Sequence, residues 1–199
     1  NSDAIEIVQV DQAKVRLSIP PGKNQTGTIK INNYSAESKR VKIYAQDWAY
    51  LPVCDGTKDF KPAGTTNLSA ANWITFLPSE FSIPAYGRQA LNYTVKVPVD
   101  AKGGYYAVLF FESSISEEEE KPVSEGVSVS LAVRIASLFY IEAEGTIDLK
   151  AKIEDFKVSK KESKFYITTK FSNTGNVDIT TRGTFFIIDQ DGMVFARGE

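Results

Sequence analysis

Residues 103–112 read Gly-Gly-Tyr-Tyr-Ala-Val-Leu-Phe-Phe-Glu, and residues 105–111 within them form the longest apolar run of the chain. The run has the length of a strand, is rich in aromatic and β-branched residues, and follows two glycines. A short apolar run of this kind is typical of a strand that is buried on both faces. We therefore expect residues 105–111 to form a central strand of a sheet.

The next apolar segment, residues 126–140, alternates between two kinds of side chain. Because successive residues of a strand point to opposite faces, the two kinds are separated by the fold. One face carries Val127, Val129, Leu131, Val133 and Ile135, and the other carries Ser128, Ser130, Ala132, Arg134 and Ala136. Residues 113–122 include four consecutive glutamates, which repel one another, and we interpret them as a solvated loop between the two strands.

The same period of two extends over the rest of the chain and predicts strands rather than helices. The other strand-like runs are residues 13–19, 28–31, 41–45, 73–76, 80–83, 91–97, 147–153, 165–171 and 184–188. Turn signals such as Asp191-Gly192 separate them. We predict an all-β protein of tandem immunoglobulin-like β-sandwiches, one over residues 1–142 and one over residues 143–199. The second is well short of the ~100 residues of such a domain, so we expect it to be incomplete in this chain.

The composition excludes several classes of function. The chain has no histidine, which removes Ser-His and Cys-His catalysis and nearly all ordinary zinc and copper sites. The 23 Lys and Arg residues are balanced by 25 Asp and Glu residues, so nothing points to nucleic acid. No nucleophile, phosphate-binding or dinucleotide motif occurs. We predict that the protein is not an enzyme and uses no metal or other cofactor.

The chain also carries signs of its cellular compartment. Its single cysteine, Cys54, cannot form an intramolecular disulfide, and we expect an unreactive thiol. No apolar run approaches the roughly 18 residues of a membrane helix, so we expect no integral membrane segment. The polar start, Asn1-Ser2-Asp3-Ala4, suits a mature protein after removal of a signal peptide. We expect an extracytoplasmic protein, in the periplasm or on the cell surface.

Several segments of the first domain follow one another in an order that is found in a known family. They are residues 14–17, 21–22, 28–33, 41–48, 84–87, 93–98 and 103–112 and the strand end Leu138-Phe139-Tyr140. In this order they resemble the N-terminal immunoglobulin-like domain of the PapD-like periplasmic pilus chaperones. Residues 171–177 and 182–184 are similar to immunoglobulin-like domains of secreted bacterial surface proteins, among them the WxL-interacting group.

The resemblance implies a protein-binding function. Pilus chaperones lend a strand with alternating apolar side chains to an incomplete pilin sandwich. A lysine directly before the Leu-Phe-Tyr segment and an arginine on the first strand bind the terminal carboxylate of the pilin. In this chain Ser137 occupies the position of that lysine, and Arg134 is the nearest base. The candidate partner-binding residues are Arg16, Val127, Val129, Leu131, Val133 and Arg134.

Three functions remain open at this point. The first is an extracytoplasmic module that binds a protein partner, such as a pilin-like or cell-surface subunit, through its sheet edges. The second is a structural scaffold of the cell envelope or surface. The third is carbohydrate binding by the aromatic residues Trp48, Tyr50 and Trp73, although for Trp73 we favour core packing. A one-residue slip or a bulge near Ser137 would exchange the two faces of the strand, so the register there decides which face meets a partner.

Overall fold

The computed structural model describes residues 8–52, 56–114, 132–162 and 164–198. The chain divides into two compact units, Asn1–Ile147 (unit 1) and Asp148–Glu199 (unit 2), where the sequence placed a boundary near residue 142. The described residues form strands and one 3-10 helix, η1 (Ala71–Trp73). The prediction of an all-β fold is confirmed. None of the described residues belongs to a helix long and apolar enough to cross a membrane.

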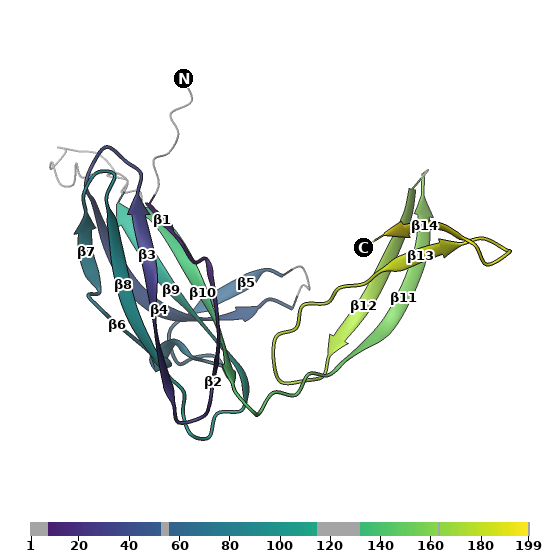
Figure 1. Cartoon of the computed structure of the whole chain (residues 1–199), viewed down its shortest axis with the longest axis horizontal. Helices are drawn as coiled ribbons and strands as arrows, with labels where there is room; N and C mark the ends of the chain where they lie inside the picture. The colour runs from purple at the N-terminus through teal and green to yellow at the C-terminus, as the bar shows by residue number, and fades with distance from the viewer. Residues whose placement is uncertain (1–7, 53–55, 115–131, 163, 199) are drawn as a thin grey trace, which may run out of the picture. The chain divides into compact units, whose positions relative to one another are not determined.

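Unit 1 is a sandwich of two sheets (Figure 1). The first sheet has the order β1-β3-β8-β6, formed by β1 (Val8–Val10), β3 (Asn24–Asn33), β8 (Arg88–Lys96) and β6 (Ile74–Leu77). The second sheet has the order β2-β10-β9-β4-β5, formed by β2 (Lys14–Ile19), β10 (Ala132–Ala143), β9 (Gly103–Ser114), β4 (Lys39–Tyr50) and β5 (Lys58–Lys61). A further strand, β7 (Glu80–Ile83), pairs with the first residues of β4.

The main core lies between the two sheets, as the alternation of apolar residues requires. Ala107, Leu109 and Phe111 of β9 face this core, together with Phe139 and Ile141 of β10. The first sheet contributes Ile29, Ile31, Leu91, Tyr93 and Val95. Removal of these side chains from water is the main driving force that joins the two sheets.

A second apolar cluster covers the outer face of the second sheet. Its buried members are Trp48, Val108, Phe110 and Tyr140. The indole Nε1 of Trp48 donates a hydrogen bond to the carbonyl of Ala107 over 2.8 Å. Because residues 107–111 are all buried, β9 is a central strand that is covered on both faces, as its sequence predicts.

A buried carboxylate fixes the point where β4 turns away from β9. β4 pairs with β9 up to Gln46 and with β5 from Asp47 onward. The Asp47 side chain is fully buried and accepts hydrogen bonds from five donors in the loop beyond β5. These donors are the backbone N–H groups of Thr65, Thr66 and Ala71 and the hydroxyls of Thr66 and Ser69, at 2.7–3.4 Å. The loop then takes the place of β4 beside Tyr106 of β9.

Unit 2 consists of two separate hairpins. The first joins β11 (Ala151–Lys161) to β12 (Lys164–Asn173), and the second joins β13 (Phe185–Ile188) to β14 (Val194–Gly198). The predicted Asp191-Gly192 turn closes the second hairpin, with Gly192 in the left-handed region at φ 81°. Each hairpin is a two-stranded sheet of its own.

Candidate protein-binding edge

Half of β10 has an open backbone edge. On one side, β10 pairs with β9 over its whole length, from Ala132–Ser114 to Ala143–Gly103, without a shift in register. On the other side, β2 runs parallel to β10 and pairs only with residues 138–143. Among the described residues, no strand pairs with this side of residues 132–137. We call this segment the open edge.

The period of the strand identifies the backbone groups that the open edge presents. The N–H of Leu138 donates to the carbonyl of Ala13, so Leu138 points its backbone groups toward β2. Residues two apart in a strand point their N–H and C=O groups to the same side. The N–H and C=O groups of Ala132, Arg134 and Ala136 therefore face the open edge, where a further strand could accept and donate hydrogen bonds.

The open edge exists because the chain between β1 and β2 crosses from one sheet to the other. Asp11 holds this crossing against the first sheet, since its backbone N–H donates to the carbonyl of Lys30 and its Oδ1 accepts from the N–H of Lys30. Gln12 adds a hydrogen bond from Nε2 to the carbonyl of Thr28. Gln12 and Ala13 contact β10 at Ser137 and Leu138, and strand pairing begins at Lys14, so residues 132–136 have no strand partner on that side among the described residues.

Arg134 lies on the outer face of the sheet beside this edge. Its guanidinium stacks 4.3 Å from the centre of the Phe110 ring and donates to the hydroxyl of Tyr44 over 3.3 Å. The Tyr44 hydroxyl in turn donates to Oε2 of Glu112 over 2.8 Å. Burial raises the pKa of Tyr44 above its ordinary value, the hydrogen bond from Arg134 opposes this, and Glu112 adds to it. The Tyr44 hydroxyl thus bridges Glu112 and Arg134 and positions the Arg134 guanidinium.

Two further cations lie on β2, where the open edge ends. Lys14 and Arg16 both place their charged groups over the ring of Tyr140, at 4.4 and 4.5 Å from its centre. They share a face because they are two residues apart, while Val15 between them packs into the main core. Arg16 was predicted as a site residue, and Lys14 was not. The open edge thus begins at Ala132 and ends near the positive charges of Lys14 and Arg16.

Ser137 has a structural role at the end of the open edge. Its side chain is fully buried, and its hydroxyl donates to the carbonyl of Gln12 over 2.6 Å. A serine at this position therefore ties β10 to the crossing segment, and it does not face a partner as a lysine would.

The structure places three of the six predicted site residues. Arg16 and Arg134 lie on the outer face of the second sheet. Val133 is half-buried and shares the face of Ile135, which packs against the main core. Val127, Val129 and Leu131 lie outside the described residues, as do Cys54 and the glutamate run.

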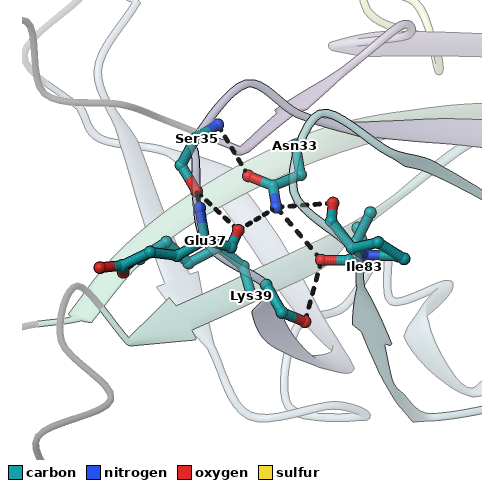
Figure 2. A network of polar contacts seen from close by, with 7 residues as sticks. Asn33, Ser35, Glu37, Lys39 and Ile83 are labelled. Carbon is teal, nitrogen blue, oxygen red and sulfur yellow. Dashed lines mark hydrogen bonds and ion pairs between the residues drawn. The ribbon is translucent and has the colours of Figure 1, made fainter.

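The loops at this end of the sandwich are held by one buried amide (Figure 2). Ser113 of β9 pairs with both Val133 and Val41, so the loop that precedes β4 lies at the same end as the open edge. Asn33, the last residue of β3, donates from Nδ2 to the carbonyls of Glu37, Ile83 and Pro84 at 2.7–3.1 Å. Its Oδ1 accepts from the N–H of Ser35. These bonds tie the loop before β4 to the end of β7.

The aromatic residues considered for carbohydrate binding do not form an exposed platform. Trp48 is 1% exposed and belongs to the outer cluster. Trp73 packs against the main core and lies 4.3 Å from the ring of Tyr105. Of the three, only Tyr50 is exposed, and it meets Trp48 edge to face. Within the described ranges, no group of three or more Cys, Asp and Glu residues is arranged to hold a metal ion.

No protein-family model matches the chain, and no curated protein matches its sequence. Solved structures do match. The class 5 fimbrial chaperone CfaA is 16% identical with a TM-score of 0.50, and the match covers 96% of this chain and 79% of CfaA. A chain of a chaperone–tip adhesin complex of CFA/I fimbriae biogenesis is 12% identical, also at 0.50, with 96% and 78% covered. The E. coli chaperone DraB is 11% identical at 0.46, with 96% and 95% covered.

At these identities the likeness concerns the fold, and it rests on the two structures at 0.50. Their similarity extends over nearly the whole chain, in agreement with the sandwich described above. The chain has the PapD-like fold of the pilus chaperones.

Proposed function

We propose that this chain is a non-enzymatic protein-binding module of the pilus-chaperone kind, which works outside the cytoplasm and pairs with a partner strand along the open edge of β10. The observation that carries the proposal is the outward-facing backbone of Ala132, Arg134 and Ala136 on a strand whose other side is fully paired. An unpaired strand edge is a template for another strand, and strand addition is a common way to recognise an extended peptide.

The charges near the edge favour one kind of partner terminus. A strand that runs along the open edge toward β2 ends beside Lys14 and Arg16, where a terminal carboxylate would receive charge-assisted hydrogen bonds. Arg134, held by Tyr44, lies beside the middle of the edge. One of the similar structures comes from a chaperone–tip adhesin complex, which supports a pilin-like or cell-surface subunit as the partner.

The apolar residues that precede the open edge extend the proposal. Val127, Val129 and Leu131 continue the alternation of Val133 in the sequence. We assign them the role of lending apolar side chains to the partner, as the strand of a pilus chaperone does for a pilin.

The test is a photo-crosslinking residue at Ala132, introduced into the full chain in its own cells, with the captured protein identified by mass spectrometry. The variant Ala136→Pro removes one outward N–H without touching the pairing to β9. We expect one subunit of defined mass to be captured by the parent chain and lost in Ala136→Pro, while the thermal midpoint stays within a few degrees. Fractionation of the same cells should place the chain outside the cytoplasm.

The matched control is Ile135→Pro, whose N–H faces β9, and this variant should fail to fold. Capture that persists in a folded Ala136→Pro variant would contradict binding at this edge. Capture of wall material in place of one subunit would favour the envelope scaffold.

A further inference from the structure

The first hairpin of unit 2 separates apolar from charged side chains. Strand pairing places Ile153, Phe156 and Val158 of β11 on one face, because their partners in β12 are two residues apart. Glu154 is the extra residue of a bulge, which keeps Ile153 on the same face as the other two. The three apolar side chains are 63%, 58% and 60% exposed, in that order. Two of them, Ile153 and Phe156, line a groove of about 430 Å³ beside residues 181–185.

One edge of this hairpin has no strand beside it. β11 pairs with β12 on one side, and no described strand pairs with its other side. A two-stranded sheet is at best marginally stable in water, whereas a sheet of three or more strands with an apolar face is stable. An unpaired edge is a template for another strand. We call the unpaired side of residues 155–161, which follow the bulge, the β11 edge.

The charges of the β11 edge differ between its two ends. Asp155 lies at the start, and Lys160 and Lys161 lie at the end. Asp155 forms an ion pair with Lys157 over 2.7 Å, whereas no described carboxylate is ion-paired with Lys160 or Lys161. A strand with an acid at one end and bases at the other complements an antiparallel copy of itself, because each end then meets the opposite charge.

One antiparallel register uses the whole of the β11 edge in both copies. Its twofold axis passes between the two Val158 residues, which lie opposite each other. The other residues that lie opposite one another are Asp155 and Lys161, Phe156 and Lys160, and Lys157 and Ser159. The two members of each pair are an even number of residues apart in β11 with no bulge between them, so they lie on the same face. The register therefore forms two Asp155–Lys161 ion pairs and keeps the apolar faces of the two hairpins together.

The neighbouring registers are unfavourable. An axis at Lys157 sets this lysine opposite itself, and an axis at Ser159 sets Lys157 opposite Lys161. Like charges that lie directly opposite each other in a sheet are destabilising. A slip by a single residue turns the apolar face of one hairpin to the side of the charged face of the other. The charges and the alternation of β11 thus select the register with its axis at Val158.

We propose that two copies of the chain associate through unit 2, with β11 of one copy antiparallel to β11 of the other about a twofold axis at Val158. The resulting sheet has four strands in the order β12-β11-β11-β12, and its apolar face is continuous across the axis. The same residues of both copies form the contact, as a twofold axis requires. The inference goes beyond the proposed function, because it concerns unit 2 and does not involve the open edge of β10.

The first test exchanges charges in the full chain and measures association by sedimentation equilibrium. The parent chain should form a dimer whose fraction rises with concentration. Asp155→Lys and Lys161→Glu should each weaken the dimer about tenfold or more, because either variant sets two pairs of like charges opposite each other. An equimolar mixture of the two variants should recover the dimer, and so should the chain that carries both substitutions, because opposite charges then meet again.

The matched control is Lys96→Glu, which makes the same change of charge as Lys161→Glu on an exposed residue of β8 in unit 1. It should leave the dimer unchanged. A chain that stays monomeric at every concentration would overturn the proposal. A dimer that neither single variant weakens, or that the mixture does not restore, would overturn it as well.

The second test locates the twofold axis. In a Cys54→Ser background, Val158→Cys places the one thiol on the β11 edge, and Thr168→Cys places it on an exposed residue of β12. A short bismaleimide should join two copies of the Val158→Cys variant, because residues directly opposite each other have Cβ atoms about 4.5–5.5 Å apart. The Thr168→Cys variant should crosslink several-fold more slowly. Equal rates would show that the copies meet by random collision and would overturn the twofold contact.

Discussion

Phe111 in unit 1 and Phe156 in unit 2 are the same residue type on long strands, yet the first is 1% exposed and the second 58%. The two strands differ in sequence, since β9 is an almost continuous apolar run and β11 has apolar residues on one face only. The layer that covers each ring also differs. Phe111 packs against the other sheet of the sandwich, whereas Phe156 lines an open groove. The contrast shows that an apolar strand face is buried only where a second layer of strands covers it.

The largest expected effect on stability comes from truncating each of the two phenylalanines. Phe111→Ala should lower the free energy of unfolding by about 3–5 kcal/mol, because it removes a fully buried ring and leaves a cavity. Phe156→Ala should cost under about 1 kcal/mol, because a half-exposed ring loses little burial. Urea unfolding of the two variants, followed by tryptophan fluorescence, measures both losses. Equal losses would mean that Phe156 is buried in solution.

The next effect compares two aspartates. Asp47→Ala should cost about 2–3 kcal/mol, because it leaves buried N–H and hydroxyl donors of the 65–71 loop without an acceptor. Asp155→Ala in unit 2 removes an exposed ion pair with Lys157 and should cost less than about 0.5 kcal/mol. Thermal unfolding in parallel checks the difference. A small loss for Asp47→Ala would show that water replaces the carboxylate and that the loop does not depend on it.

Much of the fold can be predicted from the sequence because strand alternation is a local signal. The central strand β9 follows from one apolar run. In contrast, β5 (Lys58–Lys61) contains a single apolar residue, Phe60, and alternation cannot reveal it. It is a strand because β4 offers it a backbone partner and because Phe60 packs edge to face on Phe110.

The candidate site is less predictable, because its contacts join distant parts of the chain. Lys14 could have been found, since it lies two residues before Arg16 and must share its face. Tyr44 and Glu112 could not, because their contact depends on the register between β4 and β9. The burial of Ser137 depends on a carbonyl 125 residues earlier in the chain.

A smaller effect concerns alkaline pH and the core of unit 1. Burial raises the pKa of Tyr93 in the folded state above its unfolded value of about 10. Its contribution to stability is fully present below the unfolded pKa and is lost as the pH rises through the higher folded pKa, because the unfolded state releases its proton first. Tyr93→Phe should therefore make the decrease in unfolding free energy between pH 9 and 11 shallower. Urea unfolding across this range measures the slope, and an unchanged slope would mean that Tyr93 ionises equally in both states. The same burial effect at Tyr44 keeps part of the slope in the variant.

The smallest effect on stability compares the two halves of β10. Lys14 lies on the strand that covers one half, with its ammonium 4.4 Å from the centre of the Tyr140 ring. Lys14→Gln should cost about 0.5–1 kcal/mol at most, since it removes one exposed cation–π contact. If a partner strand pairs with residues 132–137 of β10 and ends at the Lys14 ammonium, Lys14→Gln should lower crosslinking of the partner at Ala132 several-fold while the fold stays intact. Lys96→Gln, an exposed lysine on β8 of the opposite sheet, is the matched substitution and should leave capture unchanged. A loss of capture in both variants would point to general charge attraction, whereas a loss in Lys14→Gln alone requires a partner whose strand reaches the start of β2.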